Sequence, residues 1–177
     1  MSRLFSSITI RGQKIKNKCW VSPMCQYSSE DGFSNNWHLV HLGSRAAGGA
    51  GLVMTEAAAI SPEGRISPND LGIWKDDHIE GLLKITNFVK EMNSIPAIQI
   101  ANSGRKGSTR KPWEEGYSVS GNEGGWQPIG PSPIPFDNKS VTPKELSIKE
   151  IKDLENKFAD SAIRAEKAGF KGIELHM

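Results

Sequence analysis

The sequence alternates short apolar segments with longer amphipathic ones, and this alternation limits the folds that the chain can adopt. Segments short and apolar enough for single strands lie at 19–22, 51–59, 95–101 and 170–175. Segments with the apolar spacing of helices lie between them, at 37–47, 78–92 and 148–168. Right-handed crossovers join strands that alternate with helices in this way, so that the strands form a parallel sheet. The sequence therefore predicts an α/β fold.

Local signals mark the ends of several of these elements. Residues 4–10 and 14–18 flank a turn and predict a small hairpin within residues 1–18. Asp77 is a candidate N-cap for the helix at 78–92, whose expected buried stripe is Ile79, Leu82, Leu83, Thr86 and Val89. Ser147 and Glu150 have the spacing of a capping box, and Gly169 is suited to end the last helix.

A long connection, residues 102–143, separates the third strand from the last helix and is rich in Gly, Pro, Ser and Trp. Unstructured loops longer than ~15 residues inside a compact domain are usually functional lids or disordered. Apolar residues recur along this connection, at Trp113, Tyr117, Trp126, Ile129, Ile134 and Phe136. We therefore expect an ordered loop over the active site.

Candidate reactive side chains follow the carboxyl ends of the predicted strands. They are Cys25, Tyr27, Glu56, Gln99 and His176. Active sites of (β/α)8 barrels are built at this end of the strands, and a complete barrel has eight strands and about 250 residues. The chain supplies about four βα units of such a barrel. It has no Gly-x-Gly-x-x-Gly or Walker sequence, which argues against a doubly wound nucleotide-binding sheet.

Composition excludes several classes of function. The net charge is +2 and no dense run of Lys and Arg occurs, so we expect neither nucleic acid nor a membrane as partner. The two cysteines, Cys19 and Cys25, are too few for a disulfide framework or a zinc site. No apolar stretch is long enough to span a bilayer, so we expect a cytoplasmic protein.

Ordered motifs along almost the whole chain resemble the Old Yellow Enzyme family of FMN-dependent NAD(P)H oxidoreductases, most closely its bacterial xenobiotic-reductase branch. Each motif alone is weakly specific, whereas their order and spacing together are highly specific. The motifs include Ser22-Pro23-Met24-Cys25-Gln26-Tyr27, Trp37-His38, Thr55-Glu56-Ala57, Pro62-Glu63-Gly64-Arg65-Ile66, Gly72-Ile73-Trp74, Ile98-Gln99-Ile100-Ala101, Gly104-Arg105-Lys106 and Gly172-Ile173-Glu174-Leu175-His176.

The resemblance implies a fold, a cofactor and a reaction. The fold is a (β/α)8 barrel capped by a hairpin, of which residues 1–177 are the amino-terminal half. In the family, NADPH or NADH reduces FMN, which passes the hydride to an activated alkene such as an enone or a nitroalkene. The resemblance also implies a homo-oligomer at full length, and it places the family's phosphate-binding loops outside this half.

Matching positions imply roles in flavin binding. Ser22, Pro23 and Met24 match the segment whose backbone lies along the flavin, although an ordinary turn is the alternative. Cys25 matches a thiol near the reactive edge of the ring, and a buried structural cysteine is the alternative. Ala57 matches a position whose backbone N–H faces the flavin carbonyl edge.

Polar positions match further roles. Gln99 lies in an otherwise apolar strand, where its amide needs a partner, either the flavin edge or main-chain groups. His176 matches the residue that binds the activating oxygen of the substrate, and Tyr27 matches another substrate-binding position, with core packing as the alternative. Glu56 is better suited to a structural ion pair, and Asn102 departs from the histidine of relatives.

Other functions remain open at this point. The chain alone could be a catalytically inactive half-barrel with two open sheet edges. A relative of 2,4-dienoyl-CoA reductases would carry its iron–sulfur cysteines in the other half. An aldolase or isomerase using Glu56 and His176 is disfavoured, because no Schiff-base lysine or metal cluster accompanies them.

Overall fold

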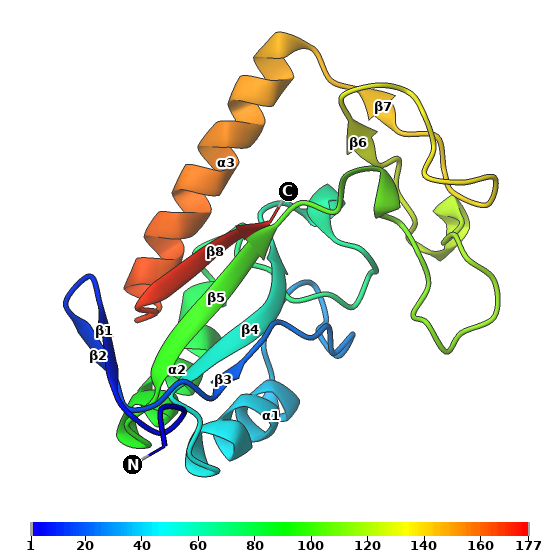
Figure 1. Cartoon of the computed structure of the whole chain (residues 1–177). Coiled ribbons are helices and arrows are strands. Elements are labelled where there is room, and N and C mark those ends of the chain that lie inside the picture. The colour runs from blue at the N-terminus through cyan, green and yellow to red at the C-terminus, as the bar shows by residue number, and fades with distance from the viewer. Residues whose placement is uncertain (1, 177) are drawn as a thin grey trace.

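The computed structural model describes residues 2–176 and shows a four-stranded parallel sheet with helices packed against one face (Figure 1). The strand order is β3-β4-β5-β8, as expected when each crossover helix delivers the next strand to the growing edge. The main elements are β3 (Trp20–Val21), α1 (Asn36–Ala47), β4 (Leu52–Ala59), α2 (His78–Glu91), β5 (Ile95–Ala101), α3 (Ile148–Lys167) and β8 (Gly172–His176). The predicted α/β architecture is confirmed.

The two faces of the sheet have different roles. On one face, Ile98 and Ile100 of β5 pack with Leu82 of α2 and Ala165 of α3 in the main core cluster. Side chains alternate along a strand, so Gln99 and Ala101 point to the opposite face and line a cavity. The register between β4 and β5 shifts between Met54 and Ala57. After the shift, the last residues of β4, 57–59, pair with residues 99–101 of β5. The helices therefore cover the outer face and leave the inner face for a site.

A small hairpin lies at the amino-terminal end of the inner face. Its strands are β1 (Ile8–Ile10) and β2 (Gln13–Ile15), paired antiparallel. Ile15 is 3 % exposed and packs in one cluster with Leu52 of β4 and Ala97 of β5. The hairpin thus closes the end of the sheet that lies opposite the carboxyl ends of the strands (Figure 1).

The long connection folds into short pieces held by specific contacts. It contains the strand β6 (Ile129–Gly130), which pairs in parallel with β7 (Lys144–Glu145), and 3₁₀ turns at Gly104–Lys106 and Gly121–Glu123. The Trp126 indole donates a hydrogen bond to the carbonyl of Glu63 at 2.9 Å. The Arg65 guanidinium lies over the Trp126 ring, 4.9 Å from its centroid. These contacts tie the connection to the loop after β4.

Two local expectations were wrong, and a third was right only in position. The segment 19–22 was expected to be a buried strand, but β3 is an edge strand, and Trp20 is 44 % exposed because β3 pairs only with β4 within residues 2–176. Asp77 is the N-cap residue of α2, but its side chain makes no capping hydrogen bond, because its backbone already has the αR conformation. Leu83 is exposed, and Ile85 instead packs with α1.

The capping box of α3 is confirmed. The Ser147 hydroxyl accepts a hydrogen bond from the backbone N–H of Glu150, and the Glu150 carboxylate accepts one from the Ser147 N–H at 2.9 Å. None of the helices in residues 2–176 is long and apolar enough to cross a bilayer.

Candidate active site

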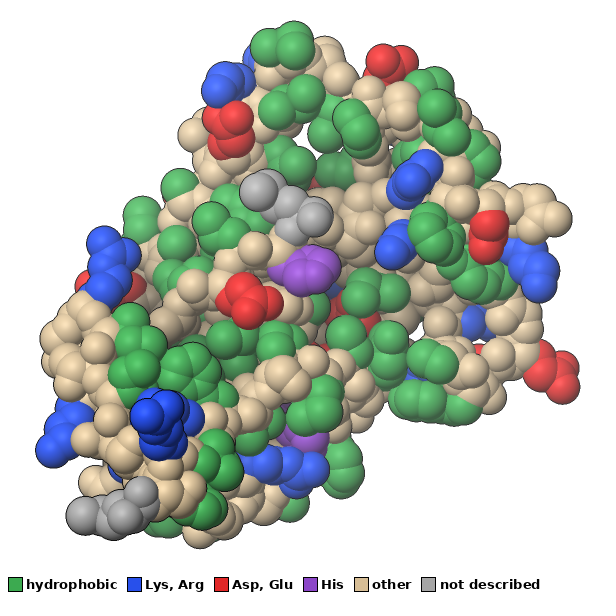
Figure 2. Space-filling view, viewed as in Figure 1, with side chains coloured by type: hydrophobic (Ala, Val, Ile, Leu, Met, Phe, Trp, Pro, Cys, Tyr) green, Lys and Arg blue, Asp and Glu red, His purple; other side chains and the backbone are tan. Residues whose placement is uncertain are grey.

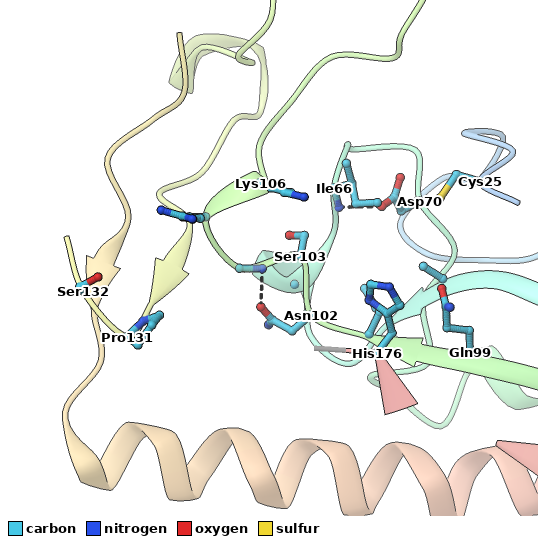
Figure 3. Close-up of a pocket in the computed structure, with 16 residues that line it drawn as sticks. Cys25, Ile66, Asp70, Gln99, Asn102, Ser103, Lys106, Pro131, Ser132 and His176 are labelled. Atoms are coloured by element: carbon cyan, nitrogen blue, oxygen red, sulfur yellow. Dashed lines mark hydrogen bonds between the residues drawn. The ribbon is translucent and has the colours of Figure 1, made fainter. Parts of the chain in front are cut away.

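A cavity of about 670 Å³ opens at the carboxyl ends of the strands (Figure 3). It brings together four of the predicted site residues, Cys25, Ala57, Gln99 and His176, which come from four separate segments. The loop after β5 and residues Pro131 and Ser132 of the long connection form the opposite wall. The cavity therefore lies where a barrel fold places its active site.

Small side chains form the strand-side surface of the cavity. Ala57 and Ala59 of β4 and Ala101 of β5 all line it. Ala57 pairs in register with Gln99, and Ala59 pairs with Ala101. Because methyl groups project little from a sheet, this surface leaves room for a broad, flat ligand. Gln99 adds a polar group to the same surface.

Cys25 lies in the segment after β3 and is partly buried. Burial raises the pKa of its thiol to about 11, and the nearby carboxylates of Asp70 and Glu56 act in the same direction. The thiol is therefore neutral at physiological pH. A neutral, polarisable sulfur is suited to packing against a ligand rather than to nucleophilic attack.

Asp70 is a site residue that the sequence reasoning missed. It is 2 % exposed and lines the cavity. Its carboxylate accepts hydrogen bonds from the backbone N–H of Ile66 at 2.6 Å and from the Ser67 hydroxyl at 2.9 Å. Burial raises the pKa of Asp70 to about 6. The residue therefore fixes the turn that presents Ile66 to the cavity, and it titrates near neutral pH.

Gln99 has a partner that neither sequence interpretation named. Its side-chain amide donates a hydrogen bond to the carboxylate of Glu174. The two residues are in-register neighbours on β5 and β8, so their side chains project from the same face. Glu174 thus orients the Gln99 amide, whose carbonyl oxygen is left to meet a ligand.

Glu56 is a structural residue, as expected. It is 4 % exposed, and its Oε2 accepts the backbone N–H of Gln26 at 2.8 Å. Its Oε1 lies 3.2 Å from His38 Nε2. His38 Nδ1 accepts the N–H of Asn35 at 3.0 Å, and His38 Nε2 also lies 3.2 Å from the Ser29 hydroxyl. Glu56 therefore ties α1 to the segment that carries Cys25.

The remaining predicted residues lie outside the cavity lining described for residues 2–176. Ser22 and Met24 are exposed, and Pro23 is half-buried, all on the segment that leads from β3 to Cys25. Tyr27 has a positive φ of 50° and packs edge-on against Trp113, with ring centroids 5.6 Å apart. Its side chain also interacts with that of Cys25. Tyr27 thus stands beside the cavity, next to the long connection.

Asn102 shapes the wall of the cavity formed by the loop after β5. Its side-chain oxygen accepts the N–H of Gly104 at 2.8 Å, which fixes the start of the 3₁₀ turn (Figure 3). Its Nδ2 is buried and has no hydrogen-bond partner in the described part of the chain. Residues 2–176 also contain no cluster of three or more His, Cys, Asp or Glu side chains that could hold a metal ion.

Known proteins resemble this chain over nearly all of its length. A 46 % identical relative is the NADPH dehydrogenase of Bacillus cytotoxicus, where 99 % of this chain matches 47 % of the relative. The NADPH dehydrogenase of Bacillus pumilus is 45 % identical, with 99 % of this chain and 48 % of the relative covered. The chain thus spans about half the length of the curated relatives that it matches.

Solved structures agree in fold. The old yellow enzyme homologue of Zymomonas mobilis superposes with a TM-score of 0.82 at 29 % identity, over 99 % of this chain and 48 % of that one. Morphinone reductase in complex with tetrahydroNAD superposes with a TM-score of 0.84 at 24 % identity, over 99 % and 49 %. These neighbours confirm that the sheet corresponds to about half of a TIM barrel.

The sequence profile of one family covers nearly the whole chain. It is described as the NADH:flavin oxidoreductase / NADH oxidase family, and it matches residues 3–177. The resemblance to the Old Yellow Enzyme family is thereby confirmed. The chain belongs to the NADH:flavin oxidoreductase / NADH oxidase family.

Proposed function

We propose that this protein is an FMN-dependent oxidoreductase that passes a hydride from NADPH or NADH, through the flavin, to an activated alkene such as an enone or a nitroalkene. Residues 1–177 form about half of its barrel domain, with 1–18 as the hairpin cap and 102–143 as the active-site loop. The observation that carries the proposal is the alanine-floored cavity at the carboxyl ends of the strands, with Cys25, Gln99 and His176 around it.

The residues of the cavity fit a flavin ring. An isoalloxazine is flat and apolar on its faces and has hydrogen-bonding groups along one edge. Ala57, Ala59 and Ala101 provide a surface without projecting side chains. The Gln99 amide, held by Glu174, provides a polar group suited to the edge of the ring. When bound, FMN supplies a carrier that accepts a hydride from a nicotinamide and donates it to a carbon atom.

The other proposed roles follow from the chemistry of each side chain. The neutral thiol of Cys25 packs against the ring and influences its electronic properties. Ser22, Pro23 and Met24 supply the backbone that leads to this contact. His176 donates a hydrogen bond to the substrate oxygen on which negative charge develops. Donors aimed at developing charge can lower a barrier by about 3 kcal/mol.

Tyr27 is proposed to bind the substrate as a second hydrogen-bond donor. Burial raises the pKa of its phenol to about 12, so the group stays protonated at physiological pH. Its position beside Cys25 and Trp113 puts it between the cavity and the long connection.

A protein that contains the complete barrel provides the test. We expect it to purify with bound flavin and to oxidise NADPH when cyclohexenone is the acceptor. A Gln99→Ala variant should bind FMN more weakly, whereas Lys149→Ala, on the exposed surface of α3, should bind it like the wild type. A colourless protein that gains no flavin absorbance after addition of FMN would contradict the proposal.

The isolated 177-residue chain has a second, simpler expectation. The outer edges of β3 and β8 have no strand neighbour within residues 2–176, and Leu175 of β8 is 61 % exposed. Open edges favour pairing with other chains. We infer that the isolated chain binds FMN weakly and self-associates. A monomer that binds FMN stoichiometrically would contradict this inference.

A further inference from the structure

Two cations stand together at the mouth of the cavity. Arg105 and Lys106 are consecutive and exposed, and both line the cavity. Figure 3 shows the Lys106 side chain directed across the cavity toward Ile66. Figure 2 shows basic side chains, with apolar ones beside them, over the long connection on this face of the molecule. The rim of the proposed flavin site is therefore positively charged on one side.

A rigid turn holds the two cations. The Lys106 N–H donates to the Ser103 carbonyl at 3.1 Å, and the Gly107 N–H donates to the Gly104 carbonyl at 3.1 Å. Gly104 has a positive φ of 54°, which glycine adopts without strain. The Asn102 side chain anchors the same turn from inside the cavity. The turn thus fixes the backbone from which both cationic side chains project.

The charges of Arg105 and Lys106 are left free for a ligand. Neither side chain has a carboxylate within 4.0 Å in the described part of the chain, although Lys157 and Arg164 each have one. Both instead lie over the ring of Phe136, with Lys106 Nζ at 4.6 Å and Arg105 Cζ at 5.8 Å from its centroid. The ring holds the cations in place without neutralising them.

We propose that Arg105 and Lys106 bind the phosphate groups of NADPH, including its 2′-phosphate, and so make NADPH the preferred reductant. This inference rests on the proposed function. With a flavin ring on the alanine surface, only the nicotinamide end of the nucleotide can enter the cavity, so its phosphates remain at the rim. Guanidinium and ammonium groups are the usual partners of phosphate, and the 2′-phosphate is the group that NADH lacks.

Binding of the oxidised nucleotides tests the proposal without requiring turnover. Dissociation constants for NADP⁺ and NAD⁺ are measured by calorimetry on the FMN-loaded protein, for wild type, Arg105→Ala, Lys106→Ala and the double variant. The double variant should bind NADP⁺ about tenfold more weakly, while NAD⁺ affinity falls less. Arg105→Lys should retain most of the preference, because it keeps the charge. Lys149→Ala, which removes a remote exposed cation, should change neither constant.

Salt and kinetics give two further readouts. The KM for NADPH should rise with ionic strength in the wild type and less steeply in the double variant, because the lost contacts are screened charge pairs. Equal weakening of NADP⁺ and NAD⁺ would overturn the proposal. Weaker FMN binding with an unchanged nucleotide preference would also overturn it, since the pair would then hold the flavin phosphate. An NADP⁺ preference that depends on the pair in a protein without turnover would support this inference and refute the proposed function.

Discussion

Replacement of Asp70 by asparagine tests the electrostatics of the site. Asp70 is almost fully buried beside the cavity and accepts hydrogen bonds from Ile66 and Ser67. An asparagine keeps an oxygen for the Ile66 N–H and an amide for the Ser67 hydroxyl, but it carries no charge. The substitution therefore removes a titration while preserving the turn.

The magnitude follows from the pKa of Asp70, which burial raises from 3.8 to about 6. One pKa unit corresponds to about 1.4 kcal/mol, so ionisation of Asp70 destabilises the folded protein by about 3 kcal/mol at pH 7. Below pH 3.8 the group is protonated in both states and this penalty is absent. Between pH 3.8 and 6 the folded protein binds more protons than the unfolded one, so the free energy of unfolding falls as pH rises, and the full penalty is present above pH 6.

Thermal unfolding between pH 4 and pH 7 measures the effect. The stability of Asp70→Asn relative to the wild type should rise with pH by about 3 kcal/mol, or a relative Tm gain of about 6–12 °C for a chain of this size. Asp70→Ala is the control, because it also removes the charge but leaves the Ile66 and Ser67 donors unpaired at every pH. A Tm difference between Asp70→Asn and the wild type that stays constant with pH would refute the reasoning.

Three further substitutions test other parts of the structure. Ser147→Ala should lower the free energy of unfolding by about 1 kcal/mol, measured by urea titration, because α3 loses its N-cap; an unchanged midpoint would argue against the cap. Gly72→Ala should destabilise by about 3 kcal/mol or fail to express, because a Cβ would lie 2.0 Å from the Trp74 ring; wild-type Tm would contradict this. Glu56→Gln should cost about 2 kcal/mol in the same titration and weaken FMN binding, since one amide oxygen cannot replace both carboxylate contacts, to the Gln26 N–H and to the His38 ring; wild-type values for both would argue against a role of Glu56 in holding the Cys25 segment.

Most of the fold was predictable from the sequence because its elements have strong local signals. The segment 95–101 is an apolar run whose limits coincide with β5, and the capping residues of α3 stand in the expected positions. The burial of β3 could not be read from its apolar residues, because burial of a strand depends on its neighbours. Among the described residues, β3 has β4 on one side and no strand on the other, so Trp20 faces solvent.

The candidate site was predictable where chemistry coincided with the end of a strand. Cys25, Gln99 and His176 each follow or lie near a carboxyl end, and the structure brings them to one cavity. Asp70 gave no such signal, because it lies in an irregular loop where an acidic residue is normally solvated. Its burial comes from the folding of the loop around its own carboxylate, a contact that no periodicity in the sequence records.

The state of the Cys25 thiol depends on residues that are distant from it in the sequence. Glu56 fixes the backbone at Gln26 and also places a carboxylate near the sulfur, while Asp70 approaches from another loop. Both negative charges act with burial to keep the thiol protonated, so the same contacts that position Cys25 also suppress its nucleophilicity. A thiol meant for covalent catalysis would need a cation or a base nearby. The acidic surroundings of Cys25 therefore favour a binding role for the sulfur, which agrees with a flavin as the reactive group of the site.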